Sequence, residues 1–438
     1  MMLWISIRDS LWFIPGIAAF LGVVLATLLV QVPPPSPGGG LTELWLFGGG
    51  AEGARGVLST IAGSLITVTG VVFSVTIVAL QLASSQFTPR VLRSFVADRA
   101  NQIVLGTFIG TFTYTLLVLR TTRSAVDDGE SFVPQVAVSV AVGLLLISIA
   151  ALIFFIDHAA RSVQASVIIH RETQNTLNRI PDLFPHEIGE KVSNEKVDPE
   201  VPVGPGGLVP ALTSGYVQAV SDDELLKLAA ERNLVVRLEA PMGAFVLAGG
   251  PLATVWPAER LDKKTCEAVQ SRIVLGFERT PEQDIELGIQ AISDIAVRAL
   301  SPGINDPTTA TLCIDRLTEI LARRGRCRES ARGRTDRGGQ LRLIAATSSF
   351  ERAVGLAFDQ IRHYGSQNPV IAKKLLSAFL ELAAVLPSTR RSVLAQHVNA
   401  VLIASRERIK NSLDLQSIEQ LGEHAAVVGL DAERSGPS

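Results

Sequence analysis

Residue types that commonly carry catalysis or bind metals are scarce in this chain. Its 438 residues include three cysteines and six histidines. Cys266, Cys313 and Cys327 form no CxxC pair, so their spacing predicts neither a zinc site nor a disulfide framework. The histidines follow no ligand pattern, and no GxSxG, HExxH or P-loop motif is present, nor a GxGxxG after a predicted strand. We therefore expect no enzyme activity, no metal and no cofactor.

Charged residues are also few, at 19% of the chain, and they are unevenly distributed. The first 156 residues contain four long stretches without any charge: Leu11–Val32, Gly56–Pro89, Asn101–Leu119 and Ser131–Ile156. A helix needs about 20 apolar residues to cross the hydrocarbon core of a bilayer. We therefore predict an integral membrane protein whose first partner is the lipid bilayer. The formal net charge of −2 predicts no nucleic-acid partner.

The expected fold class is a membrane α-helical bundle of four transmembrane helices, followed by a cytoplasmic α+β domain. The α+β domain begins with a small β-rich module and continues as a helical region. The predicted domains are a transmembrane domain at 1–156 with spans at about 11–32, 57–82, 102–119 and 132–156, a helical stalk and linker at 157–210, the β-rich module at 211–260, and the helical region at 261–438.

Arginines near the span ends predict the orientation, because positive charge collects on the cytoplasmic side of a membrane. Six arginines fall on one side and three on the other; the six are Arg8, Arg90, Arg93, Arg99, Arg161 and Arg171, and the three are Arg55, Arg120 and Arg123. We expect both termini, and with them the large C-terminal domain, to lie in the cytoplasm.

Span two carries a polar stripe, in which small polar residues and two valines recur every three or four residues. The stripe consists of Thr60, Ser64, Thr67, Val71, Ser74, Val78 and Gln81. This spacing places all of them on one helical face. Two interpretations are open. The stripe lines a water-filled path in which Val71 and Val78 form a dewetting constriction, or its hydroxyl groups join packed membrane helices.

Other features of the membrane half concern packing. Gly106 and Gly110 in span three are four residues apart, a spacing that lets two helix backbones approach closely. No ionisable residue lies inside a predicted span, which argues against a proton-driven pump. Residues 84–100 form either an amphipathic helix on the inner membrane surface or a connector. Residues 44–47 form either an interfacial anchor or a loop cluster packed on helix ends.

The soluble half begins with short β-type runs at 215–220, 234–239, 243–248 and 253–256, with a helix predicted at 221–232. From Thr280 onward the chain is predicted to be helical. Thr280 is expected as N-cap, with Pro281 in the first turn and Gln283 completing a capping box. Further helical patterns cover 341–363, 370–386 and 391–410.

The string ALSPGINDPTTA joins two of these helices, and Asp306 is expected to cap the second one. Two interpretations remain for this loop. It is a well-capped turn, or it is a ligand loop at a helix N-terminus, formed by Ser301, Asn305, Asp306 and Thr308. The following segment, Arg323–Gly339, contains seven arginines and is predicted to be a mobile loop that is solvated or touches anionic lipid.

Two strings, residues 85–90 (SQFTPR) and 299–310 together with Glu282, Gln283 and Asp284, resemble the bacterial predicted membrane proteins of the family called domain of unknown function 2254. The resemblance covers almost the whole chain. It implies a bacterial inner-membrane protein with a short helical bundle and a cytoplasmic domain, and it implies no activity, cofactor or catalytic residue.

Two functions follow from these observations. The first is a homo-oligomeric channel or passive transport protein, gated by its cytoplasmic domain, and it depends on the polar stripe of span two. The second is a membrane-anchored sensor or scaffold whose cytoplasmic domain binds a ligand or a protein partner. The second depends on the size of the soluble half and on the resemblance of residues 211–257 to a coupling module.

Overall fold

The structure is a computed structural model that describes residues 12–33, 46–86, 98–123, 132–184, 202–281, 283–328, 333–346 and 348–434. The chain divides into two compact units, Met1–Ile168 and Ile169–Ser438. The expected amphipathic segment at 84–100 and the expected anchor at 44–47 fall largely outside the described residues. Phe47 is described: its side chain packs against the apolar core of the first unit, and its N–H donates to the Ser139 hydroxyl over 2.8 Å.

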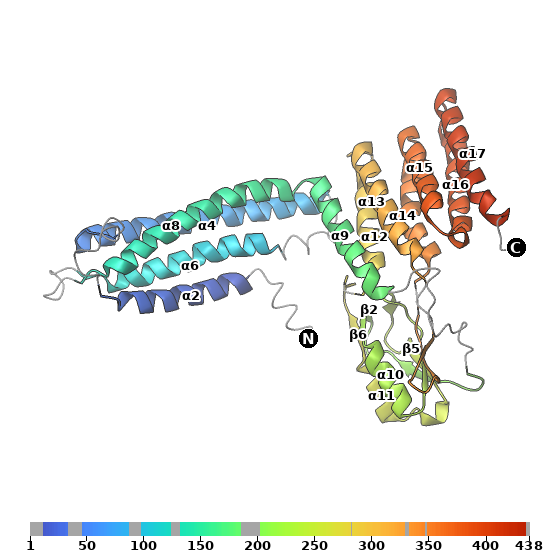
Figure 1. Cartoon of the computed structure of the whole chain (residues 1–438), viewed down its shortest axis with the longest axis horizontal. Coiled ribbons are helices and arrows are strands. Elements are labelled where there is room, and N and C mark those ends of the chain that lie inside the picture. The colour runs from blue at the N-terminus through green and yellow to red at the C-terminus, as the bar shows by residue number, and fades with distance from the viewer. Residues whose placement is uncertain are drawn as a thin grey trace. The chain divides into compact units, whose positions relative to one another are not determined.

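The first unit is a bundle of long apolar helices that lie side by side (Figure 1). They are α2 (Phe13–Val30), α4 (Ala51–Gln86), α6 (Arg99–Thr121) and α8 (Gln135–Ser162). Four of the described helices are long and apolar enough to cross a membrane, which confirms the four predicted spans. The ordinary helix periodicity of side chains then decides which face of each helix packs inward.

Helix α6 is central in this bundle, because it packs against α2, α4 and α8. Half of its apolar window is buried, against about a fifth in each of the other three helices. The Tyr114 hydroxyl of α6 donates to the Ala137 carbonyl of α8 over 2.8 Å. Gly106 and Gly110 face α2, so the small-residue spacing predicted to allow close packing is used between two helices of the same chain.

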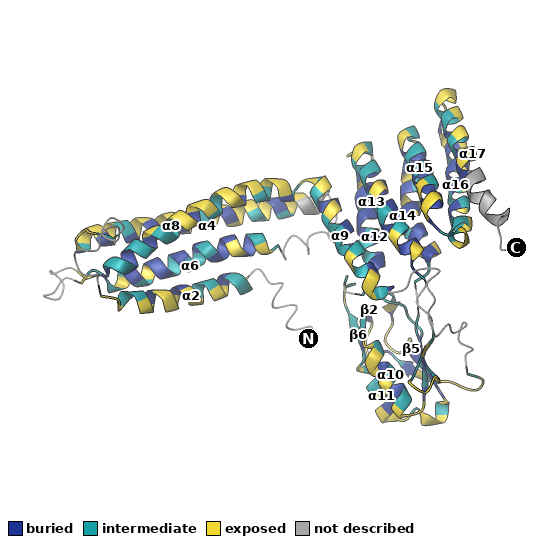
Figure 2. Ribbon diagram, viewed as in Figure 1, coloured by how far each residue is buried: buried dark blue, intermediate teal, exposed yellow. Residues whose placement is uncertain are grey.

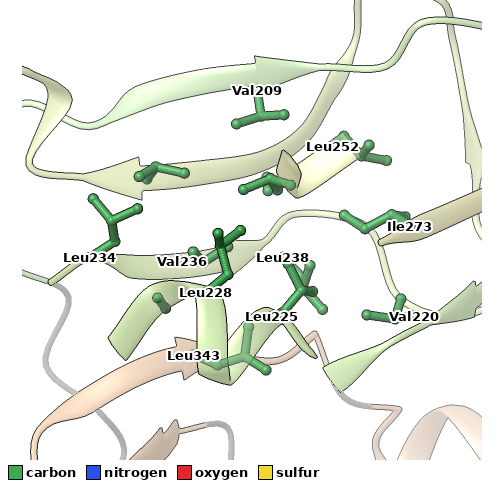
Figure 3. Close-up of a cluster of buried hydrophobic side chains, with 14 of the residues drawn as sticks. Val209, Val220, Leu225, Leu228, Leu234, Val236, Leu238, Leu252, Ile273 and Leu343 are labelled. Atoms are coloured by element: carbon green, nitrogen blue, oxygen red, sulfur yellow. The ribbon is translucent and has the colours of Figure 1, made fainter. Parts of the chain in front are cut away.

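The second unit begins with a small α/β module built on two sheets among the described residues. One sheet has the strand order β1 (Gly207–Pro210), β5 (Pro251–Trp256), β3 (Val235–Leu238), β8 (Leu341–Ile344) and β7 (Gly333–Thr335), and the other has β4 (Phe245–Val246), β2 (Gly215–Val220) and β6 (Ile273–Gly276). Helices α10 (Asp222–Glu231) and α11 (Lys263–Gln270) complete the module. Its core is apolar and includes Leu225, Val236 and Leu343 (Figure 3).

A helical array follows the module. It consists of α12 (Ile285–Ala299), α13 (Pro307–Arg326), α14 (Phe350–Gly365), α15 (Pro369–Val385), α16 (Ser388–Arg408) and α17 (Ser412–Arg434). A further helix, α9 (Ala165–Leu183), comes before the α/β module in the chain. Neighbouring helices of the array pack pairwise, α12 with α13 and α14, and α15 with α16 and α17. The fold class is therefore a set of four long apolar helices followed by a mixed α/β region.

Two local predictions in this region are wrong. Helix α12 begins at Ile285 with Asp284 as its N-cap, four residues later than expected. The predicted capping residues instead join α12 to β2: the Thr280 hydroxyl donates to the Gln218 carbonyl, and the Gln283 amide oxygen accepts from the Val220 N–H. A long-range pairing of this kind outweighs a local capping pattern because it satisfies the polar groups of a strand edge.

The second wrong prediction concerns the region from 261 onward, which was predicted to be helical but also contains strands. The expected loop at 323–339 is partly regular, because α13 continues to Arg326 and β7 begins at Gly333. Leu341–Ile344, predicted to begin a helix, forms β8 and pairs in parallel with β3, with Val236 opposite Leu343. The short run Leu-Arg-Leu-Ile is compatible with either structure, and a partner strand about a hundred residues away decided it.

Candidate functional site

Helix α4 has two faces of different character. One face is buried against the bundle and includes Leu58, Ile61, Leu65 and Val72. The polar stripe lies on the other side of α4, and all seven of its residues are exposed in the chain. Figure 2 shows exposed and buried positions alternating along the helices of the first unit. Among the described residues, the stripe therefore lies away from the core of the first unit. A polar face turned away from its own bundle is unusual in lipid, where polar groups are costly.

Hydrogen bonds determine what the stripe presents outward. The hydroxyls of Thr60, Ser64 and Thr67 donate to carbonyls one turn earlier on the same helix, over 2.8, 2.9 and 3.0 Å. Their protons are thus satisfied, while the oxygen lone pairs remain available as acceptors. Val71 and Val78 interrupt these polar groups and are 57% and 52% exposed.

Glycines along one edge of the stripe were missed in the sequence. Gly56, Gly63 and Gly70 are seven residues apart, and a Cβ at any of them would meet no heavy atom within 4 Å in the described parts of the chain. With Thr60 and Thr67 they form an exposed row of small residues spaced alternately four and three apart. This spacing keeps one seam of a helix against a neighbouring helix. A search for period seven in the sequence would have found it.

The expected ligand loop forms the turn between α12 and α13. Asp306 caps α13, since its carboxylate accepts from the Thr309 N–H over 3.0 Å and from the Thr309 hydroxyl over 2.6 Å, which confirms the predicted cap. These bonds lower the pKa of Asp306. The Ser301 hydroxyl donates to the Arg298 carbonyl, Asn305 has a positive φ of 49°, and Thr308 is exposed. The ligand interpretation of this loop stays a prediction.

The second unit contains a cleft of about 570 Å³ between the α/β module and the start of the helical array. Its wall is acidic, with Asp182, Asp222, Asp223, Glu224, Asp284 and Glu286, and Arg334 reaches in from β7. Arg334 pairs with Asp222 at 2.9 Å, and Arg279 pairs with Asp284 at 2.7 Å. The described residues hold no group of three or more side chains arranged to bind a metal ion.

Burial changes the electrostatics of this cleft. It raises the pKa of Asp222 and of Asp284 above the ordinary carboxyl value, although the paired arginines act in the opposite direction. Asp222 lies in the first turn of α10 and Asp284 is the N-cap of α12, and negative charge is favourable at both positions. The acidic wall is therefore compatible with the helix ends that form it, and it favours positively charged groups in the cleft.

Comparison with known proteins places the chain in a family. The model of a family described as "Predicted membrane protein (DUF2254)" matches residues 8–381. Two proteins described as uncharacterized, one from Mycobacterium bovis and one from Mycobacterium tuberculosis, are each 35% identical to this chain over 416 residues. The match covers 92% of this chain and 77% of each relative, and no solved structure matches. The chain belongs to the DUF2254 family of predicted membrane proteins.

Proposed function

We propose that the protein is a homo-oligomeric channel or passive transport protein of the bacterial inner membrane, gated by its C-terminal unit. In this proposal the α4 helices of several copies surround a common axis and line a water-filled path. The observation that carries it is the exposure of the whole polar stripe on α4, whose opposite face supplies the contacts to its own bundle. The row Gly56, Gly63 and Gly70 gives neighbouring copies a surface for close approach.

The free-energy cost of placing polar side chains in hydrocarbon favours a stripe that lines water, rather than one that faces lipid. The side chain of Gln81 is exposed, and an amide that faces hydrocarbon without a partner costs several kcal/mol. Water in a path satisfies this amide and the outward lone pairs of the threonines. Val71 and Val78 would form narrow apolar rings that stop conduction by dewetting. The absence of ionisable residues from the predicted spans supports passive movement over proton coupling.

The proposed orientation keeps both termini in the cytoplasm. The arginine distribution supports it, with six arginines on the proposed inner side and three on the outer side. The bacterial origin of the two mycobacterial relatives supports the choice of membrane. In this orientation the second unit, with its acidic cleft, meets cytoplasmic ligands and partners.

We expect Val71→Ser and Val78→Ser each to raise potassium efflux from liposomes several-fold over the wild type, because a hydroxyl wets the apolar constriction. The matched control is Ile66→Ser. Ile66 is also exposed, at 55%, but lies about 140° around α4 from Val71 at 3.6 residues per turn. The control should leave efflux unchanged. Silent vesicles for the wild type and both valine variants, with normal reconstitution, would contradict the channel.

A second function is favoured by the acidic cleft: a membrane-anchored sensor or scaffold that binds a cationic ligand or the basic segment of a partner. We expect a labelled tetralysine peptide to bind the purified full chain saturably, measured by fluorescence anisotropy, and tetraglutamate not to bind. Asp223→Asn combined with Glu224→Gln should weaken binding several-fold while leaving the Arg334–Asp222 pair intact. Glu231→Gln, on the same helix but outside the cleft, is the control. Equal binding by all variants would argue against this function.

A further inference from the structure

The chain passes from the first unit to the second within a helix. The first unit ends at Ile168, while α9 runs from Ala165 to Leu183. At 1.5 Å per residue this helix is about 28 Å long. Backbone hydrogen bonds along a helix keep its length and direction nearly constant, which a flexible linker does not do. Helix α9 is therefore a stiff segment with one end in each unit.

The join between α8 and α9 is short and hydrogen-bonded. Two residues separate Ser162, the last of α8, from Ala165, the first of α9. The Gln164 N–H donates to the Arg161 carbonyl over 3.1 Å, and the Gln164 carbonyl accepts from the Ile168 N–H over 3.1 Å. Backbone hydrogen bonds thus hold the join to both helices, so a displacement of α9 acts on the end of α8.

The C-terminal end of α8 is in turn tied to α6, the central helix of the bundle. His158 lies four residues before Ser162, and its Nε2 atom is 2.9 Å from the Asp98 Oδ2 atom. Asp98 is the N-cap of α6 and accepts from the Ala100 N–H over 2.9 Å. A displacement at this end of α8 therefore reaches the helix that packs against α2, α4 and α8.

The remainder of α9 packs on the helical array. Gly288 of α12 leaves room for Thr176 of α9: a Cβ at Gly288 would lie 3.1 Å from the Thr176 Cβ atom and would overlap its hydroxyl. Eight residues further on, the Phe184 ring centroid lies 3.8 Å from the guanidinium of Arg324 in α13. These two contacts fix both the position and the direction of this segment on the array. The buried residues of the segment recur every three or four positions on one face: Ile169, Thr173, Thr176, Ile180 and Phe184.

The C-terminal end of α9 also borders the acidic cleft. Asp182, Leu183 and Phe184 line it together with Glu286 of α12 and Ser348. The cleft lies between the α/β module and the array, so a change in its width moves the array, and α9 with it, relative to the module. The helix that continues from the last span is thus part of the wall of this cleft.

We propose that α9 couples the two units: a shift of the helical array is passed through α9 to the C-terminal end of α8, and from there through the His158–Asp98 pair to α6. Coupling over such a distance is carried by stiff helices and tightly packed or hydrogen-bonded joins. The use of this coupling in gating rests on the channel proposed above, because α4 packs on α6. The coupling itself does not depend on whether α4 lines a path.

The test is hydrogen exchange of the full chain in detergent after α9 has been loosened from the array, by Gly288→Ala or by Phe184→Ala. We expect exchange to rise about threefold or more in α9 and also in the last two turns of α8, residues 155–162. A flexible insertion of four residues, Gly-Ser-Gly-Ser, between Val163 and Gln164 should break the coupling. With the insertion present, each substitution should raise exchange in α9 and leave α8 unchanged relative to the insertion alone.

Two variants keep a general loss of stability apart from loosening of α9. Gly303→Ala is the matched control, since a Cβ at Gly303 meets no atom within 4 Å in the described part of the chain. It should exchange like the wild type. Thr176→Ala combined with Gly288→Ala should restore most of the wild-type pattern, because it removes the hydroxyl and the methyl group that the new Cβ would meet.

The proposal is overturned if exchange rises in α9 but not in α8 of the chain without the insertion. It is also overturned if the rise in α8 persists with the insertion, or if neither substitution loosens α9. Potassium efflux from liposomes is measured separately on the same variants. Coupled exchange together with silent vesicles supports the role of α9 and counts against the channel alone.

Discussion

Replacing Gly110 with alanine is expected to separate α2 from α6 and to destabilise the membrane bundle. A Cβ at Gly110 would lie 2.9 Å from the Ala18 carbonyl oxygen, and a Cβ at Gly22 would lie 2.6 Å from the Gly110 carbonyl oxygen. Both contacts are with backbone, which cannot rotate away as a side chain can. Overpacking of this kind costs about 1–3 kcal/mol. Because α6 packs on every other helix of the bundle, loosening it affects the whole first unit.

The measurement is the midpoint of thermal unfolding of the purified chain in detergent, with proteolysis to locate the opened segment. Gly143→Ala, in α8, is the matched control, since a Cβ at Gly143 meets no atom within 4 Å in the described regions of the chain. The control should unfold like the wild type or slightly above it, because alanine is the better helix former by about 1 kcal/mol. If Gly110→Ala unfolds at the wild-type midpoint, the close crossing of α2 and α6 is wrong.

Replacing Arg324 with alanine is expected to produce the largest loss of stability in the second unit. Arg324 is 1% exposed, and its guanidinium lies 3.8 Å from the ring centroid of Phe184. It also donates to the Ser348 carbonyl over 3.1 Å. Truncation to alanine leaves a cavity beside the Phe184 ring and removes the donor that the part-buried Ser348 carbonyl accepts from. We expect a loss of about 3 kcal/mol or more, from the cavity and the lost hydrogen bonds together.

Hydrogen exchange of the full chain checks this result, because exchange should increase in α13 and α14 more than in the α/β module. Arg326→Ala is the control on the same helix, since Arg326 is exposed. Arg324→Lys should recover only part of the stability, because an ammonium lacks the planar group that stacks on Phe184. Equal stability of Arg324→Ala and Arg326→Ala would mean that the arginine is dispensable.

Gly110 and Arg324 show how much of the fold could be predicted from the sequence. The pair Gly106 and Gly110 signalled close packing, but the sequence could not say whether the partner was a helix of the same chain or of another copy. Arg324 lay in an arginine-rich segment that composition predicted to be a mobile loop. Its neighbour in space, Phe184, is far away in sequence, and no local pattern reveals a cation–π pair across such a distance.

The candidate site, too, could be predicted only in part from the sequence. Periodicity placed the seven residues of the polar stripe on one face of span two, and the structure has all of them exposed together. Which way that face points depends on the packing of α4 against α6 and α8. The acidic cleft was not predicted, because its wall comes from helices and strands that are distant in the chain.

The sequence by itself determined the four apolar spans, the polar stripe and the Asp306 cap, because each depends on residues within a few turns of one another. Lipid allows a long uncharged segment little choice but a helix. Only the tertiary structure decided that the stripe faces outward, that Leu341–Ile344 pairs with β3, and that Asp284 rather than Thr280 starts α12. Those outcomes depend on contacts between distant segments, where burial and strand pairing outweigh local preference.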